Sequence, residues 1–180
     1  MREFKPLDKA LRIHTERLLL RPITEKDTDM VLSWRNADYV RENFFYRVPI
    51  SREEHLNWLY EKCEKGLVFQ FVVEIAETGE PIGSVYLQRY NEEEDSLESG
   101  VFFSENAPAG KGYATEAVSA MNDYAFETLK VSKTIARVID SNKKSLNLHL
   151  RAGFTEGSRS TDYITPGHIP VTAVTFEKRK

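Results

Sequence analysis

The segment that most constrains the fold of this chain is a glycine-containing loop between a short apolar stretch and an amphipathic one. The loop reads Ala109-Gly110-Lys111-Gly112-Tyr113-Ala114. Residues 99–103 before it have the composition of a strand, and the residues after it place apolar side chains at helical spacing: Ala114, Ala117, Val118, Met121, Ala125 and Leu129. A second strand-like stretch follows at 134–139. Because a strand–helix–strand unit joins parallel strands, we predict that residues 99–103 and 134–139 are parallel neighbours.

The loop has the properties of an anion site. Backbone N–H groups at the start of a helix lack intrahelical acceptors, and small side chains leave room for a phosphate to approach them. Two other phosphate loops fit less well, because Gly112 stands where a P-loop needs serine or threonine and Thr115 stands where the dinucleotide fingerprint needs a third glycine. On these residues alone, a tight turn that uses glycine only for its geometry stays an equal alternative.

The remaining elements alternate in type along the chain. Capping boxes predict two helices, one starting at Thr24 with Asp27 three residues later, and one starting at Ser51 and reaching about residue 64. A short helix is predicted at 142–151. Further strands are predicted at residues 18–20, 68–75, 82–88 and through 174–176.

This order of elements predicts an α/β protein of the α+β type. We expect a mixed, mostly antiparallel sheet with flanking helices, in which the one parallel strand pair forms the ligand cleft beside the glycine loop. Residues 68–88 form a hairpin that turns at 78–81, and a solvated loop follows at 91–95. Since no repeat or linker divides the chain, residues 1–180 are expected to form a single domain with a core from about 14 to 178.

Charge and cysteine content argue against several protein classes. A net charge of −3 gives no general attraction to nucleic acid or to an anionic membrane, so neither is expected as a partner. The single cysteine, Cys63, cannot close an internal disulfide and is predicted to be a structural thiol. The opening residues lack the apolar run of a secretory signal and no stretch is apolar enough to span a bilayer, so a cytoplasmic protein is expected.

A motif downstream of the loop connects it to a known family. Residues 142–154 contain Asn142-x-x-Ser145 and a distal Gly153-Phe154. Together with the loop and the Thr115-Glu116-Ala117 that follows it, this motif resembles the GNAT superfamily of acyl-CoA N-acyltransferases. The opening stretch Thr15-Glu16-Arg17-Leu18-Leu19-Leu20-Arg21-Pro22 is similar to the ribosomal-protein acetyltransferase branch of that superfamily.

The resemblance implies a GNAT-like fold with a CoA cleft, acetyl-CoA as acyl donor and no metal. It implies direct attack of a primary amine on the thioester in a ternary complex. Asn142 and Ser145 would line the cofactor, and Phe102 and Phe103 would pair with pantetheine through their backbones. The pyrophosphate would lie on the loop residues Ala109, Gly110, Lys111, Gly112, Tyr113 and Ala114. One position departs from the family pattern, since Ala107 replaces the usual Gln or Arg, and this bears on affinity for CoA.

Amine acetylation needs a neutral amine and a proton for the departing thiolate, so titratable groups are sought. His149 stands where many relatives place the tyrosine that protonates the leaving sulfur, and an imidazole with a pKa of about 6.5 suits proton transfer near neutrality. Glu98 stands on the strand that enters the cofactor site, where some relatives keep a carboxylate that deprotonates the amine directly or through water. For both residues an exposed, solvated position is the alternative.

The acceptor side is indicated by a second resemblance. Trp34-Arg35-Asn36, followed by Ile50, His55 and Trp58, is similar to nucleotide-sugar amine acetyltransferases, in which this region borders the acceptor site. There Trp34 or Trp58 would stack on a ring and Arg35 would pair with phosphate. The alternative for His55 is packing across the helix start.

Several acceptors stay open at this stage. The expected acceptor is an amine-bearing small molecule, such as a nucleotide-linked amino sugar, or a protein N-terminus, and a polyamine is a further alternative. Basic residues near the second helix favour an anionic acceptor, whereas the acidic run from Glu92 to Asp95 favours a polycation. The chain is expected to act as a monomer or homodimer. The alternative to an enzyme is a noncatalytic acyl-CoA-binding regulatory module.

Overall fold

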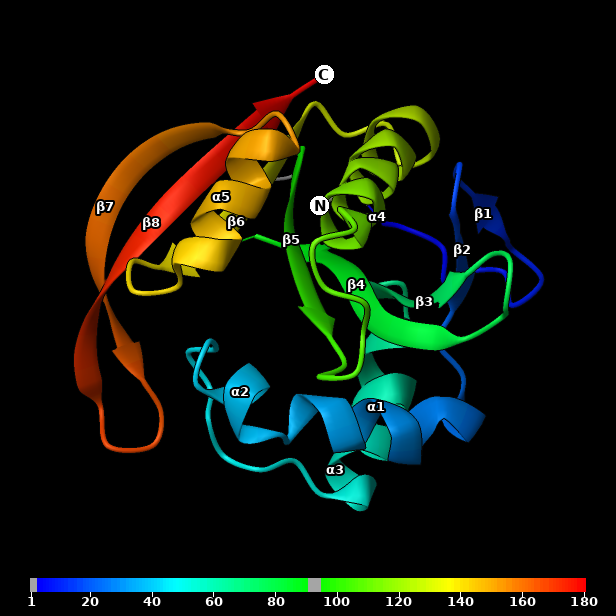
Figure 1. Ribbon diagram of the computed structural model, residues 1–180, viewed down its shortest axis with the longest axis horizontal. Helices are drawn as coiled ribbons and strands as arrows, with labels where there is room; N and C mark the ends of the chain where they lie inside the picture. The colour runs from blue at the N-terminus through cyan, green and yellow to red at the C-terminus, as the bar shows by residue number, and fades with distance from the viewer. Residues whose placement is uncertain (1–2, 91–94) are drawn as a thin grey trace.

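The computed structural model describes residues 3–90 and 95–180, and an eight-stranded sheet is its central element (Figure 1). The strand order is β1-β2-β3-β4-β5-β6-β8-β7. The strands are β1 (Ile13–His14), β2 (Leu18–Pro22), β3 (Val68–Ile75), β4 (Pro81–Arg89), β5 (Ser96–Phe103), β6 (Lys133–Ile139), β7 (Thr155–Ile164) and β8 (Ile169–Arg179). Neighbours are antiparallel except β5 and β6, which are parallel. The predicted mixed sheet with one parallel pair is confirmed.

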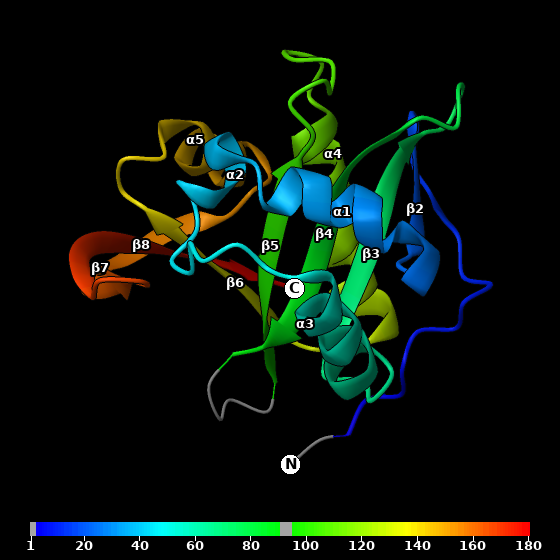
Figure 2. The same ribbon diagram turned by 90° about the horizontal axis from the view of Figure 1, so that it is seen from below.

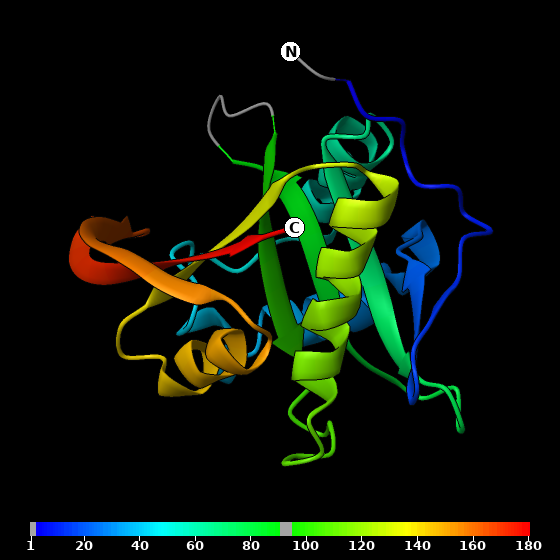
Figure 3. The same cartoon turned by 90° about the horizontal axis from the view of Figure 1, so that it is seen from above.

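Helices cover both faces of the sheet. The α-helices are α1 (Thr28–Arg35), α2 (Asp38–Arg41), α3 (Arg52–Trp58), α4 (Tyr113–Asp123) and α5 (Lys143–Arg151). A 3-10 turn, η1 (Glu25–Asp27), precedes α1, and π-helical segments η2 (Leu59–Cys63) and η3 (Tyr124–Thr128) extend α3 and α4. Helices α1, α2 and α3 lie over one face (Figure 2), and α4 and α5 lie over the other (Figure 3).

The start signals found in the sequence have the expected geometry. Ser51 Oγ accepts from the backbone N–H of Glu54 at 3.2 Å, and Glu54 Oε2 accepts from the Ser51 N–H at 2.7 Å. Thr24 and Asp27 form a similar box ahead of α1. These reciprocal bonds satisfy helix donors that have no intrahelical acceptor, which is why both helices begin where the sequence predicts.

Three apolar clusters hold the layers together. The first lies between α4 and the sheet and includes Leu18, Leu20, Phe69, Phe71, Leu97 and Met121. The second lies under α1 and α3 and includes Val31, Trp34, Leu59, Val72 and Phe102. The third lies under α5 and includes Val138, Phe154, Val174 and Phe176. Alternate residues of β5 therefore serve opposite faces, with Leu97 toward α4 and Phe102 toward α1.

The parallel pair separates after a short contact, and this separation shapes the site. β5 and β6 pair only from Ser96 opposite Lys133 to Glu98 opposite Ile135. On its other edge β5 stays paired with β4 as far as Phe103. Within the described chain, β6 does not pair with β5 beyond Glu98, which leaves this edge of β5 without a strand partner.

Two strands were not predicted. β7 is exposed along most of its length, so it lacks the alternation of apolar and polar residues that marks a half-buried strand. It pairs with β8, which begins at Ile169 after a cis peptide bond between Thr165 and Pro166. β1 has only two residues and is too short for a pattern. Of the predicted loop at 91–95, residues 91–94 lie outside the described residues.

Candidate functional site

The glycine loop enters α4 through two left-handed residues. Gly110 has a φ of 72° and Gly112, the N-cap of α4, has a φ of 78°. A Cβ at Gly110 would meet no atom within 4 Å, so the space beside this backbone is open. The first N–H groups of the helix point toward this loop without intrahelical acceptors. Open space beside partially positive amides fits a bound pyrophosphate.

The loop is fastened to the start of β2. Arg17 Nη1 donates to the carbonyl of Lys111 at 2.7 Å, and Arg17 Nε donates to Glu116 Oε2 at 2.8 Å. Glu116 Oε1 also accepts from Thr15 Oγ1 at 2.6 Å. Partial burial raises the pKa of Glu116, but the bonds from Thr15 and Arg17 outweigh it, so the pKa lies below its ordinary value. The carboxylate is thus ionised and holds the loop in place.

Asn142 and Ser145 lie together at the start of α5. Asn142 is the N-cap, and its Oδ1 accepts from the backbone N–H of Ser145 at 3.1 Å. Gly153, with a φ of 83°, follows the end of the helix as predicted. The Asn-x-x-Ser motif therefore has a capping role, which the sequence analysis did not assign to it.

His149 is buried beneath α5 instead of exposed on it. Only 3% of the residue is exposed, and its ring contacts Phe154 and stacks on Phe176. Nδ1 lies 2.8 Å from the carbonyl oxygen of Ser145, and Nε2 is buried without a hydrogen-bond partner among the described residues. Burial lowers the pKa of His149 although the contact with Ser145 raises it, so the ring is neutral at pH 7. The predicted acid role stays a prediction.

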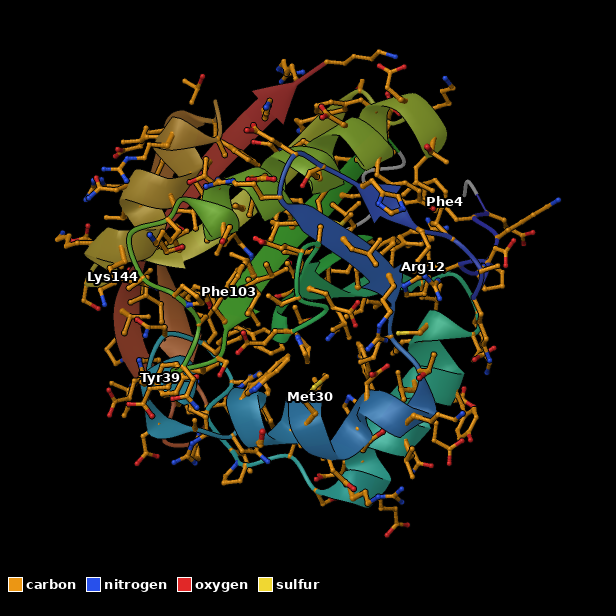
Figure 4. The ribbon with its side chains drawn as sticks, turned by 45° about the vertical axis from the view of Figure 1, so that its right-hand side comes forward. Phe4, Arg12, Met30, Tyr39, Phe103 and Lys144 are labelled. Atoms are coloured by element: carbon orange, nitrogen blue, oxygen red, sulfur yellow. The ribbon has the colours of Figure 1, made fainter. Side chains whose placement is uncertain are left out.

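The end of β5 joins the two faces of the sheet. The Phe102 side chain packs with the α1 cluster and that of Phe103 packs toward α4. Tyr39 of α2 donates from its hydroxyl to the Phe103 carbonyl oxygen at 2.9 Å, and both residues lie on the same side of the molecule (Figure 4). This bond ties the helices of one face to the strand that leads into the glycine loop.

A pocket of about 430 Å³ opens beneath α1 and α3. We name it the α1–α3 pocket, and its lining residues are Val31, Arg35, Phe44, Tyr46, Ile50, Glu54, His55, Trp58, Val68, Gln70, Tyr86, Gln88 and Phe102. Three of the four predicted acceptor residues, Arg35, His55 and Trp58, are brought together here. Trp34 is buried in the neighbouring cluster and does not line the pocket.

The sequence of the chain was compared with known families and proteins. A model of the family described as "Acetyltransferase (GNAT) domain" matches residues 17–155. The chain belongs to the GNAT acetyltransferase family. The match begins at Arg17, includes the glycine loop and ends just after the Gly153-Phe154 motif. The expected acetyl-CoA-dependent N-acetyltransferase is thereby confirmed.

Relatives of this GNAT chain include bacterial proteins. It is 28% identical over 155 residues to N-acetyltransferase p20 from Bacillus licheniformis, which covers 84% of this chain and 86% of that one. Among solved structures, it is similar to an acetyltransferase from Bacillus anthracis with a TM-score of 0.80, 22% identity and coverage of 94% and 98%. Spermidine N-acetyltransferase from Vibrio cholerae, solved with CoA and spermine, has a TM-score of 0.81, 22% identity and coverage of 92% and 96%. The two structures confirm the GNAT fold.

Glu98 lies behind the pocket of the GNAT domain and is 7% exposed. Its Oε1 accepts from Arg137 Nε at 2.8 Å, and its Oε2 accepts from Gln88 Nε2 at 2.8 Å. Arg137 also pairs with Asp162 of β7 at 3.0 Å. Instead of facing solvent, Glu98 is the buried member of a partly exposed ion-pair network, and it is one hydrogen bond from the pocket-lining Gln88.

Tyr86 lines the pocket and was not predicted from the sequence. Tyr86 lies opposite Gly100 in the β4–β5 ladder, and a Cβ at Gly100 would stand 2.1 Å from its ring. Only glycine leaves room for this ring. A glycine inside a predicted strand is a signal of close approach that could have indicated Tyr86. The Cys63 thiol, by contrast, is where expected: burial raises its pKa to about 12, so it is inert at neutral pH.

The described residues contain neither a metal-binding cluster nor a membrane-spanning helix. Over residues 3–90 and 95–180, His, Cys, Asp and Glu side chains form no group of three or more that would hold a metal ion. In the same part of the chain, no helix is both long enough and apolar enough to cross a membrane.

Proposed function

We propose that residues 1–180 act as one N-acetyltransferase domain that acetylates a primary amine held in the α1–α3 pocket. The observation that carries this proposal is that one strand, β5, connects the acceptor pocket to the glycine loop that would hold the donor. Phe102 of β5 lines the pocket, and residues 104–108 connect the end of β5 to the glycine loop. An amine in the pocket and a donor on the loop would therefore meet at the open edge of β5.

The donor half rests on backbone groups. The amides of Gly110 to Ala114 would hold the pyrophosphate of CoA, helped by Ala109 and by the charge of Lys111. The backbones of Phe102 and Phe103 would border the extended pantetheine arm, although the Phe103 carbonyl also accepts from Tyr39. Asn142 and Ser145 would border the cofactor from α5. Acetyl-CoA supplies an activated thioester: a C–N bond forms as the C–S bond breaks, the amine nitrogen loses one proton and the sulfur gains one.

Two groups are candidates for handling protons. Glu98 is proposed to accept the proton of the amine through water, and its partner Gln88 lines the pocket. The bonds from Arg137 and Gln88 fix the orientation of the Glu98 carboxylate. For the proton taken up by sulfur, His149 is the candidate from the sequence. Its buried contacts with Phe154 and Phe176 favour a packing role instead.

In the acceptor half, Trp58 and His55 would contact the substrate from α3 and Arg35 from α1. Trp34 supports this pocket from the core. A nucleotide-linked amino sugar and a protein N-terminus are the proposed acceptors. A polyamine is the second candidate, favoured by the similarity to the Vibrio cholerae spermidine N-acetyltransferase. We expect a cytoplasmic enzyme that works as a monomer or homodimer.

The test is thiol release from acetyl-CoA with a panel of primary amines, measured beside direct CoA binding. Turnover with at least one amine is expected. Tight CoA binding without thiol release from any amine would instead identify a noncatalytic CoA-binding module. Arg137→Gln, which removes the residue that orients the Glu98 carboxylate, should lower turnover without changing CoA affinity, whereas the exposed Arg159→Gln should leave both unchanged.

A further inference from the structure

Arg35 is a buried cation that forms no ion pair with a carboxylate among the described residues. Only 9% of the residue is exposed, and it lines the α1–α3 pocket. Its Nη2 donates to the Tyr46 carbonyl oxygen at 2.9 Å and its guanidinium lies 3.9 Å from the centre of the Phe44 ring. Nη1 is buried and has no hydrogen-bond partner among the described residues. Since buried charges are normally paired, this arrangement calls for an anion from outside the chain.

The carboxylates near the pocket are already engaged elsewhere. Glu54 caps α3 through the Ser51 N–H, and Glu98 is bound by Arg137 and Gln88. The other ionisable groups that act on Arg35 are the phenols of Tyr46 and Tyr86 and the guanidinium of Arg41. Arg41 is itself paired with Asp38. Within residues 3–90 and 95–180, no carboxylate forms an ion pair with Arg35, and the one carboxylate in the pocket lining, Glu54, is bonded to the Ser51 N–H.

We infer that the acceptor amine of this enzyme carries an anionic group, a phosphate or a carboxylate, that binds to Arg35. The free Nη1 supplies the hydrogen bond, and the planar guanidinium suits either oxyanion. Phe44, Tyr46 and Trp58 give the pocket an aromatic lining. The part of the substrate between its anionic group and its amine is therefore expected to be apolar. A polyamine would bring more positive charge against an unpaired arginine at low dielectric, and is therefore disfavoured. This inference rests on the proposed function.

The test compares amines that differ only in the anionic group. O-Phosphoethanolamine is paired with ethanolamine, glucosamine 6-phosphate with glucosamine, and phenylalanine with phenethylamine, and spermidine is added as a polycation. We expect kcat/KM to favour the anionic member of at least one pair by roughly 30-fold, with spermidine the poorest substrate. The phosphate and carboxylate pairs identify which anion is recognised. A preference for the neutral members or for spermidine would overturn the inference and leave the acetyltransferase assignment intact.

Variants connect this preference to Arg35. Arg35→Gln should bring the ratio of kcat/KM between the anionic and the neutral member of a pair close to one. Arg52→Gln removes an exposed guanidinium outside the pocket and should leave that ratio unchanged. Retention of the ratio in Arg35→Gln would overturn the inference. If Arg35→Gln does not fold, Arg35→Lys keeps the charge and loses the planar fork, and should reduce the ratio severalfold.

A binding measurement covers the case in which no amine releases thiol. Inorganic phosphate and benzoate are titrated calorimetrically into protein saturated with CoA, which blocks anion binding at the glycine loop. Binding of either anion that is lost in Arg35→Gln supports an anion site at Arg35 even if the proposed function fails. Absence of binding, or equal binding by the variant, contradicts it.

Discussion

Arg17 holds Glu116 through two nitrogens, with Nε donating to Oε2 at 2.8 Å and Nη2 pairing with the same oxygen at 2.6 Å. The two residues lie 99 positions apart in the chain. They connect the start of β2 to the first turn of α4. Because Arg17 also binds the Lys111 carbonyl, this pair sets the position of the whole glycine loop before any ligand arrives.

Glu116→Gln should weaken CoA binding by about tenfold, equivalent to about 1.4 kcal/mol. The change keeps the size of the side chain but removes the charge that holds Arg17, so the loop loses part of its preorganisation. Calorimetric titration with CoA measures the effect. Glu127→Gln, which alters an exposed glutamate on the segment that extends α4, is the matched control and should bind CoA like the wild type. Equal CoA affinity in the two variants would show that Glu116 does not hold the loop in its binding position.

His55→Phe should raise the KM for the acceptor about tenfold and leave CoA affinity unchanged. Both ring nitrogens of His55 are buried without partners in the described chain, and the ring stacks on Trp58. Phenylalanine preserves the stacking and removes the hydrogen-bonding groups that would serve a substrate. Steady-state kinetics measures the KM, and His14→Phe, at an exposed position on β1, is the control. An unchanged KM would assign His55 to packing.

His149→Phe should retain turnover within about threefold, because a neutral imidazole whose free nitrogen carries no proton cannot act as an acid at pH 7. Nδ1 contacts the Ser145 carbonyl, so its proton is engaged there, and Nε2 is left unprotonated. Thiol release at saturating acceptor measures this. A loss of a hundredfold in a folded variant would restore the catalytic role indicated by the sequence.

The same variant should change how stability depends on pH. Burial lowers the pKa of both His55 and His149, so the unfolded chain binds more protons than the native one just below pH 6.5. The stabilisation is fully present above that pH and is lost as the pH falls toward the native pKa values, with a slope of at most about 1.4 kcal/mol per pH unit for each ring. Urea unfolding at several pH values should give a smaller slope for His149→Phe and the wild-type slope for His14→Phe.

The sequence predicted the elements whose side chains repeat with a clear period. α4 buries one face and β3 buries both, so each has a clear pattern of apolar residues in the sequence. β7 could not be found in this way because it is exposed along most of its length and is defined by its pairing with β8. The separation of β5 from β6 also left no local signal, since it depends on where two distant strands stop pairing.

The candidate site was predicted unevenly for a related reason. The anion loop was recognisable because glycines and small residues are themselves the requirement of such a site. The environments of His149 and Glu98 depend on residues far along the chain, Phe176 and Arg137, so their burial and pairing could not be read locally. The same holds for Arg35, whose lack of a carboxylate partner is a property of the folded pocket.

The central claim, that the glycine loop holds the donor, is tested most directly by CoA titration of Gly110→Asp beside Gly79→Asp. The two glycines have φ values of 72° and 71°, and a Cβ at either position would meet no atom within 4 Å. Their backbone strain on substitution is therefore matched, but only Gly110 lies at the helix start. We predict that Gly110→Asp loses roughly 100-fold in CoA affinity through charge repulsion at the phosphate site, while Gly79→Asp binds like the wild type. Unchanged affinity in a folded Gly110→Asp would contradict the account.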